Sequence, residues 1–274
     1  MFITDFAEII DILDASPRAY LYDTAAISRH ELAFFRYGLT MPQAFIRDDV
    51  VIVSPTILDE LKFSEDTGRY HRFLQQFPRI IVIDERTMVP YFHELYAPRQ
   101  RALSHYKYCA IRAFQTIQPL ADALRHADPG DIEQTAWDGY LTYFADGRNK
   151  GEYALLWLSA MLGDIFPRLA LTFIGLDRDL YNIVDHAYYR FADIGSEIRS
   201  RRNVRILSDD VMLQALLRRG EAIDSLAAGY RDEARRVLYK EISDGIMAAT
   251  MTEGAWSNPL FVERLQQGRI EVIY

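Results

Sequence analysis

Short apolar runs recur along the chain and predict β-strands that are buried on both faces. They are rich in Val, Ile and Tyr and lack the alternation of a strand with one solvated face. Segments with helical periodicity separate the runs, and strands that alternate with helices indicate an α/β domain with a parallel sheet. The five predicted strands are residues 19–22, 50–53, 79–83, 169–174 and 203–207. The helical segments between them are residues 25–37, 56–63, 68–76 and 179–191.

A long segment between the third and fourth strands does not belong to a minimal domain of this kind. Helical patterns run over residues 99–126, 131–145 and 150–162, and the first of them stops at Asp128-Pro129-Gly130. We therefore predict a helical insertion at about residues 85–148.

A second segment follows the fifth strand. Residues 209–267 are predicted to be mainly helical, and residues 269–274 to form a late strand. The predicted organisation is one α/β domain over residues 1–207 and a mainly helical C-terminal extension, residues 208–274, packed on it.

Composition narrows the class of protein. The chain has 274 residues, of which 50% are hydrophobic and 13% aromatic, enough to fill a core. Cys109 is the only cysteine, which predicts a reducing compartment such as the cytoplasm. No apolar run is long enough to span a membrane, and the opening MFITDFAEIIDILDAS predicts an amphipathic helix rather than a signal peptide. The net charge of −8 disfavours broad binding of nucleic acid by charge, although it is compatible with a local basic path.

Acidic residues fall where the chemistry of such a sheet takes place, beyond the carboxyl ends of its strands. Asp23 follows the first strand directly, and the second strand leads through Ser-Pro into a helix that carries Glu60. Asp177 and Asp179 lie just past the fourth strand, and Glu152 is in the first turn of the helix that precedes it. Each acid alone is also explained as a helix cap or a solvated helix residue, as for Asp23 before residues 25–37.

Together, these acids predict a cation site. Four carboxylates at one end of a sheet repel each other unless a cation compensates them. Their oxygen atoms suit Mg²⁺ or Mn²⁺, which can activate a water molecule and stabilise a leaving phosphate oxygen. The predicted catalytic residues and metal ligands are Asp23, Glu60, Glu152 and Asp177, with Asp179 as a further ligand and Thr24 in support.

The order of these motifs resembles that of the PIN-domain nucleases, which include toxins of bacterial toxin–antitoxin pairs. Asp23-Thr24 in YLYDTAAI, Glu60-Leu61 in VIVSPTILDELK, Gly151-Glu152, and Asp177 with Asp179 in GLDRDL match family motifs. The resemblance covers about half the chain, residues 19–85 and 149–207. It implies a five-stranded parallel sheet in the order 3-2-1-4-5, flanked by helices, with an acidic pocket for Mg²⁺ or Mn²⁺ and metal-dependent cleavage of RNA.

The chain departs from the family pattern in several places. Gly175 stands where many members have Thr or Ser, and Glu152 stands where Asp is commoner. The insertion is much longer than in the small toxins, and the C-terminal extension has no counterpart that we can match.

Basic residues near the acids are candidates for binding phosphates, although most such clusters are solvated loops. The segment SRRNVR contains Arg199, Arg201, Arg202 and Arg205, and Arg148 and Lys150 precede Glu152. Candidate partners are RNA, with DNA as the alternative, an inhibitor (antitoxin) protein and a second copy of the chain.

Two hypotheses of function remain open from the sequence. The first is a metal-dependent endoribonuclease that hydrolyses phosphodiester bonds with four acidic residues. The alternative is a catalytically inactive binding or scaffold protein of the same fold, which acts through its helical insertion and C-terminal extension.

Overall fold

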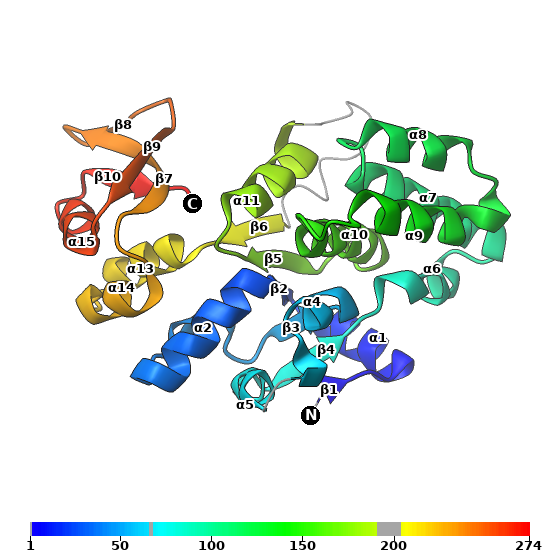
Figure 1. Ribbon diagram of the computed structural model, residues 1–274, viewed down its shortest axis with the longest axis horizontal. Helices are drawn as coiled ribbons and strands as arrows, with labels where there is room; N and C mark the ends of the chain where they lie inside the picture. Colours follow the sequence, from blue (N-terminus) through cyan, green and yellow to red (C-terminus); the bar gives the residue numbers. More distant parts are fainter. Residues whose placement is uncertain (1, 66–67, 191–203) are drawn as a thin grey trace.

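The computed structural model describes residues 2–65, 68–190 and 204–274 (Figure 1). It is an α/β structure built on a parallel sheet of six strands flanked by helices, which confirms the predicted fold class. The strands lie in the order β1-β4-β3-β2-β5-β6. They are β1 (Phe2–Ile3), β2 (Arg18–Tyr22), β3 (Val50–Val53), β4 (Arg79–Val82), β5 (Ala170–Ile174) and β6 (Val204–Leu207).

The number of strands, and with it the full order, differs from the expected five in the order 3-2-1-4-5. The additional strand is β1, which lies in the segment expected to be an amphipathic helix and pairs Phe2 with Ile80 at the edge of β4. That helix, α1 (Phe6–Ala15), begins only after Asp5, whose side chain accepts a hydrogen bond from the amide of Glu8. A strand of only two residues forms because the edge of β4 is available for pairing. The sequence pattern of the two residues therefore gives little indication of the strand.

The central strands are buried on both faces, as their composition predicted. Every residue of β3 is buried, and so are four of the five residues of β2. Helices cover both faces of the sheet (Figure 1). These helices are α2 (Thr24–Tyr37), α3 (Met41–Ile46), α4 (Pro55–Glu60), α5 (Arg69–Leu74), α10 (Lys150–Ile165) and α11 (Arg178–Asp185), with a π-helix at His186–Arg190.

The insertion is helical, as expected, but its first helix is shorter than predicted. Residues 99–126 form two helices rather than one, because Pro119 lies at the start of the second and Ile117 caps it in a non-helical conformation. The helices are α6 (Val89–Leu95), α7 (Arg99–Ala113), α8 (Gln118–His126) and α9 (Ile132–Tyr143). Short 3₁₀ turns occur at Phe63–Glu65, Glu85–Thr87 and Pro129–Asp131.

The C-terminal extension is not mainly helical, so that prediction was wrong. It contains a second, antiparallel sheet in which β7 pairs with β8, β9 and β10, and β10 lies in the predicted late strand. The missed signal is Asp244-Gly245, where both residues have positive φ (53° and 75°) between β7 and β8, as an Asp-Gly hairpin turn requires. The elements are α13 (Asp209–Arg218), α14 (Asp224–Tyr230), β7 (Arg235–Ser243), β8 (Ile246–Met247), β9 (Thr252–Trp256), α15 (Asn258–Gln266) and β10 (Ile270–Val272).

No helix among the described residues is long and apolar enough to cross a membrane.

The insertion packs on α10 through aromatic rings. Trp157 of α10 is fully buried, and its ring centroid lies 5.2 Å from that of Phe114, 5.8 Å from Tyr106 and 6.1 Å from Tyr140. Since these three residues belong to the insertion, the indole joins it to the α/β core.

We predict that Trp157→Ala lowers the free energy of unfolding by about 3–5 kcal/mol, because it leaves a cavity at this junction. Tyr108→Ala on α7 is the control, since Tyr108 is 44% exposed, and its effect should stay within about 0.5 kcal/mol. Urea denaturation of both variants tests this. Similar small losses in both would show that the insertion does not depend on the indole.

Candidate active site

Asp23 lies at the floor of the candidate site, at the junction of β2 and α2. Its amide donates a hydrogen bond to the carbonyl of Ile174, 2.9 Å away, at the end of β5. Its carboxylate caps α2 by accepting from the amide of Ala25 at 3.2 Å, and the residue is only 2% exposed. Asp23 is therefore a helix cap, and it also faces the end of the neighbouring strand.

Glu60 joins three helices at the rim of the site. One carboxylate oxygen accepts from the hydroxyl of Thr24 at 2.5 Å, and the other accepts from the amide of Gly151 at 2.8 Å. The amide of Gly151 is free to donate because the first amides of an α-helix have no partner within the helix. Thr24, which was predicted to support the site, thus donates a hydrogen bond to Glu60.

The remaining acids come from α10 and α11. Glu152 lies in the first turn of α10 and is partly buried. Asp177 is at the N-cap position of α11 without a capping bond from its side chain, and Asp179 is in the first turn of that helix. Both Asp177 and Asp179 are exposed.

The electrostatics show that these acids form one neighbourhood. The pKa of Asp23 is raised to about 8, first by burial and then by the charges of Glu152, Asp177 and Glu60, while the Ala25 amide opposes the shift. Burial also raises the pKa of Glu152, and Glu60, Asp177 and Asp179 add to it. The charged side chains that act on Asp23 in the described part of the chain are thus all acidic.

The donor chemistry fits Mg²⁺ or Mn²⁺, whereas the carboxylates do not yet converge. Hard oxygen ligands and uncompensated negative charge are what these ions require. Among the described residues, however, no three His, Cys, Asp or Glu side chains are placed to hold one ion. Glu60 and Asp23 instead face their hydrogen-bond donors. The acids therefore match these ions in charge and in donor type, but not in geometry.

The basic candidates are only partly described. Arg199, Arg201 and Arg202 lie outside the described residues. Arg205 is exposed on the edge strand β6. Arg148 is exposed and precedes α10, and Lys150 is half-buried and is the first residue of that helix.

Sequence reasoning missed several polar residues around the site. Glu85 follows β4, is 1% exposed and accepts from the hydroxyl of Thr56 on α4. The rule that found Asp23 applies to it equally, since it lies just past a strand end. Arg235 and Tyr274 of the extension donate hydrogen bonds to the loop that carries Asp177, and no local motif indicates this.

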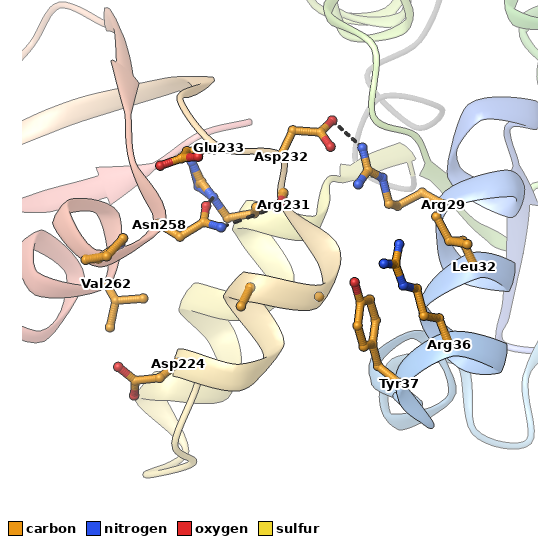
Figure 2. Close-up of a pocket in the computed structure, with 13 residues that line it drawn as sticks. Arg29, Leu32, Arg36, Tyr37, Asp224, Arg231, Asp232, Glu233, Asn258 and Val262 are labelled. Atoms are coloured by element: carbon orange, nitrogen blue, oxygen red, sulfur yellow. Dashed lines mark hydrogen bonds and ion pairs between the residues drawn. The ribbon is translucent and has the colours of Figure 1, made fainter.

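A cavity of about 620 Å³ lies apart from the acids, between α2 and the C-terminal extension (Figure 2). Arg29 and Asp232 form an ion pair across it, and Arg36 and Tyr37 extend from α2 on the same side as Arg29. None of the five candidate acids is among the described residues that line it. The cavity lies at the interface between the extension and α2.

Comparison with protein-family models, with curated proteins and with solved structures finds no match to this chain. The resemblance to PIN domains therefore rests on the motifs and on the arrangement described above.

We predict opposite effects of two Gly→Ala substitutions in α10. At Gly151, a Cβ atom would lie 2.5 Å from Oε2 of Glu60, so Gly151→Ala displaces this carboxylate and costs about 1–3 kcal/mol of unfolding free energy. At Gly163 nothing lies within 4 Å of a Cβ, so Gly163→Ala should stabilise the helix by roughly 0.5–1 kcal/mol. Equilibrium denaturation measures both. Equal stabilisation would show that Glu60 is not held against α10.

We also predict that stability falls as pH rises from about 4 to 8 in the absence of divalent ions. The pKa of Asp23 is raised from 3.8 to about 8 on folding, so the folded chain holds more protons than the unfolded chain in this window. The free energy of unfolding then decreases by up to about 1.4 kcal/mol per pH unit.

Asp23→Asn should remove this part of the slope, because Asn has no proton to lose. Asp14→Asn, at an exposed position of α1, should leave it unchanged. Chemical denaturation in EDTA at four pH values measures the slopes. Parallel profiles for wild type and Asp23→Asn would contradict the proposed burial of an ionisable Asp23.

Proposed function

We propose that this protein is a metal-dependent endoribonuclease with a PIN-like site. The observation that carries the proposal is the group of Asp23, Glu60, Glu152 and Asp177 at the carboxyl end of a parallel sheet, where the charges of described residues that act on Asp23 are all acidic. A buried acid whose pKa is raised by burial and by neighbouring charges is a candidate for a functional site. This is also the edge of the sheet at which ligands bind in open α/β folds.

We also propose that the fold itself is PIN-like. Apart from the edge strand β1, the strands lie in the order β4-β3-β2-β5-β6. This corresponds to the order 3-2-1-4-5 that the resemblance implies. The order supports the proposal because it brings β2 and β5, which precede Asp23 and Asp177, to neighbouring positions.

The acids share one role in the proposed site, which is to hold the ion. Asp23, Glu60, Glu152 and Asp177 would hold Mg²⁺ or Mn²⁺, with Asp179 as a further oxygen donor. The bound ion supplies a water of lowered pKa and neutralises charge on the phosphate. Thr24 holds one oxygen of Glu60 by a hydrogen bond. Asp23 is buried, so its carboxylate has little room to move.

The substrate class follows from charge. A phosphodiester backbone brings negative charge to a site that is already acidic. Binding it therefore requires a cation at the proposed metal site and basic side chains on the protein. Arg148 and Lys150 lie close to Glu152 in the sequence, and we propose that they contact phosphates. We propose RNA as the substrate, as the resemblance to PIN domains implies, with DNA as the alternative.

One observation favours the alternative of an inactive scaffold. The described carboxylates do not converge on a common point, and Glu60 is engaged by Thr24 and Gly151. A scaffold would keep these bonds in the presence of metal, whereas a nuclease must bind the ion. Titration with Mn²⁺ followed by calorimetry therefore distinguishes the two functions.

We predict that Asp23→Asn lowers the rate of RNA cleavage in Mn²⁺ at least about a hundredfold, since it removes a charge that helps to hold the ion. The fold should persist, because Asn can accept the same bond from the Ala25 amide.

The measurement is cleavage of a labelled RNA, with RNA binding and circular dichroism recorded for the same samples. Asp14→Asn is the matched control, and cleavage by it should equal that of wild type. Undiminished cleavage by a well-folded Asp23→Asn protein would show that Asp23 is a cap alone and would refute the nuclease mechanism.

A further inference from the structure

The loop that carries Asp177 is held by two side chains from the C-terminal extension. Nη2 of Arg235 donates to the carbonyl of Leu176 at 3.1 Å, and the hydroxyl of Tyr274 donates to the carbonyl of Asp177 at 3.0 Å. The two bonds fall on consecutive carbonyl groups between β5 and α11. The extension is thus in direct contact with the main chain of a proposed metal ligand.

Arg235 is itself held in place by buried charges. Its guanidinium lies 3.7 Å from a carboxylate oxygen of Asp209 and 3.7 Å from one of Asp210, and both acids are fully buried in the first turn of α13. Asp210 is also paired with the buried Arg231 at 2.8 Å. A buried guanidinium with these partners has few alternative positions. The group that donates to Leu176 is therefore held in place.

Asp209, one of the two acids beside Arg235, is also linked to the end of β2. Asp209 lies 2.6 Å from Nε2 of the buried His30 on α2, and Nδ1 of His30 contacts the hydroxyl of Tyr22. Tyr22 is the residue before Asp23. A chain of polar contacts therefore connects the end of β2, through His30, Asp209 and Arg235, to the loop after β5.

Tyr274 lies directly over this loop. It is 5% exposed, its ring centroid lies 5.0 Å from that of Tyr181 on α11, and a Cβ at Gly175 would lie 3.3 Å from its hydroxyl. Burial raises the pKa of Tyr274 well above its usual value, Arg235 opposes this, and the charges of Asp23 and Asp177 add to it. The hydroxyl therefore stays protonated and is within electrostatic range of both carboxylates.

We propose that Arg235 and Tyr274 are positioning residues that fix the main chain at Leu176–Asp177 and so orient the Asp177 carboxylate towards Asp23. Asp177 makes no capping bond of its own, so its direction depends on the course of the loop. Groups that orient metal ligands from behind typically change metal affinity 10–100-fold when they are removed. The inference rests on the proposed function, because it takes Asp177 to be a ligand.

The test compares Tyr274→Phe, which removes one hydroxyl, with Tyr239→Phe in the same extension. Tyr239 is 6% exposed, almost as buried as Tyr274. Its side chain packs in the main core, whereas the adjacent Leu238 packs beside Tyr274, so its hydroxyl belongs to the other face of β7. Asp177→Asn provides the reference for loss of a ligand. The full chain is used throughout, and the probe is Mn²⁺ measured by electron paramagnetic resonance.

We expect Tyr274→Phe to bind Mn²⁺ about tenfold more weakly than wild type, with a melting temperature lowered by about 2–4 °C at most. Raising Mn²⁺ should restore kcat, and Tyr239→Phe should match wild type. Arg235→Lys keeps the charge facing Asp209 and Asp210 but loses the arm that reaches Leu176, so it should weaken Mn²⁺ binding to a similar degree. This second variant decides the question if Tyr274→Phe is unstable.

Three results would overturn the proposal. If Tyr274→Phe and Arg235→Lys bind Mn²⁺ like wild type while Asp177→Asn does not, the positioning role is wrong and the proposed function stands. If Tyr239→Phe loses as much affinity as Tyr274→Phe, the effect is general loosening of the extension. If Asp177→Asn itself binds Mn²⁺ like wild type, Asp177 is no ligand, and both the positioning role and the proposed metal site fail.

Discussion

Mutual repulsion among carboxylates at the ends of β2 and β5 is the constraint on which the candidate site depends. Parallel pairing of Tyr22 with Ile174 fixes Asp23 beside the loop that leads to Asp177, and Asp23 is too buried to turn away into solvent. The chain offsets this repulsion only in part, with the Thr24 hydroxyl and two main-chain amides. Neutral donors stabilise a carboxylate without cancelling its charge, so without an ion the pKa of Asp23 is raised to about 8, and a bound cation could take the place of the proton that neutralises it below that pH.

A second group of buried acids nearby differs from Asp23 because two arginine side chains oppose the charge of its carboxylates. Asp209 and Asp210 are completely buried, like Asp23, but they face His30, Arg231 and Arg235. Removing one member of such a pair leaves a buried charge without its partner, which typically costs about 3–5 kcal/mol. The chain therefore supplies its own cations where acids serve the fold. Among the described residues, the charged groups that act on Asp23 are all acidic, and this contrast is the main reason to propose a binding site at that cluster.

The sequence was sufficient for the features that depend on short-range patterns. Apolar runs located β2 to β6, and the positions of Asp23 and Asp177 just after such runs located the edge of the sheet that carries the acids. What it could not predict depends on contacts between distant segments. The pairing of Phe2 with Ile80 and the bond from Tyr274 to Asp177 leave no periodic trace. The hairpin at Asp244-Gly245 is different, because its signal is present in the sequence and was outweighed by the helical pattern around it.

The two additions to the sheet lie at opposite ends of the molecule (Figure 1), yet each is bonded to an element that carries a proposed ligand. From the insertion, the hydroxyl of Tyr140 donates to the carbonyl of Lys150 at 2.9 Å, at the start of the helix that carries Glu152. From the extension, Tyr274 donates to the carbonyl of Asp177. These bonds reach the main chain at Lys150, two residues before Glu152, and at Asp177 itself. Their attachment there is what a site needs if it must hold like charges in a fixed arrangement until a cation and a phosphate arrive.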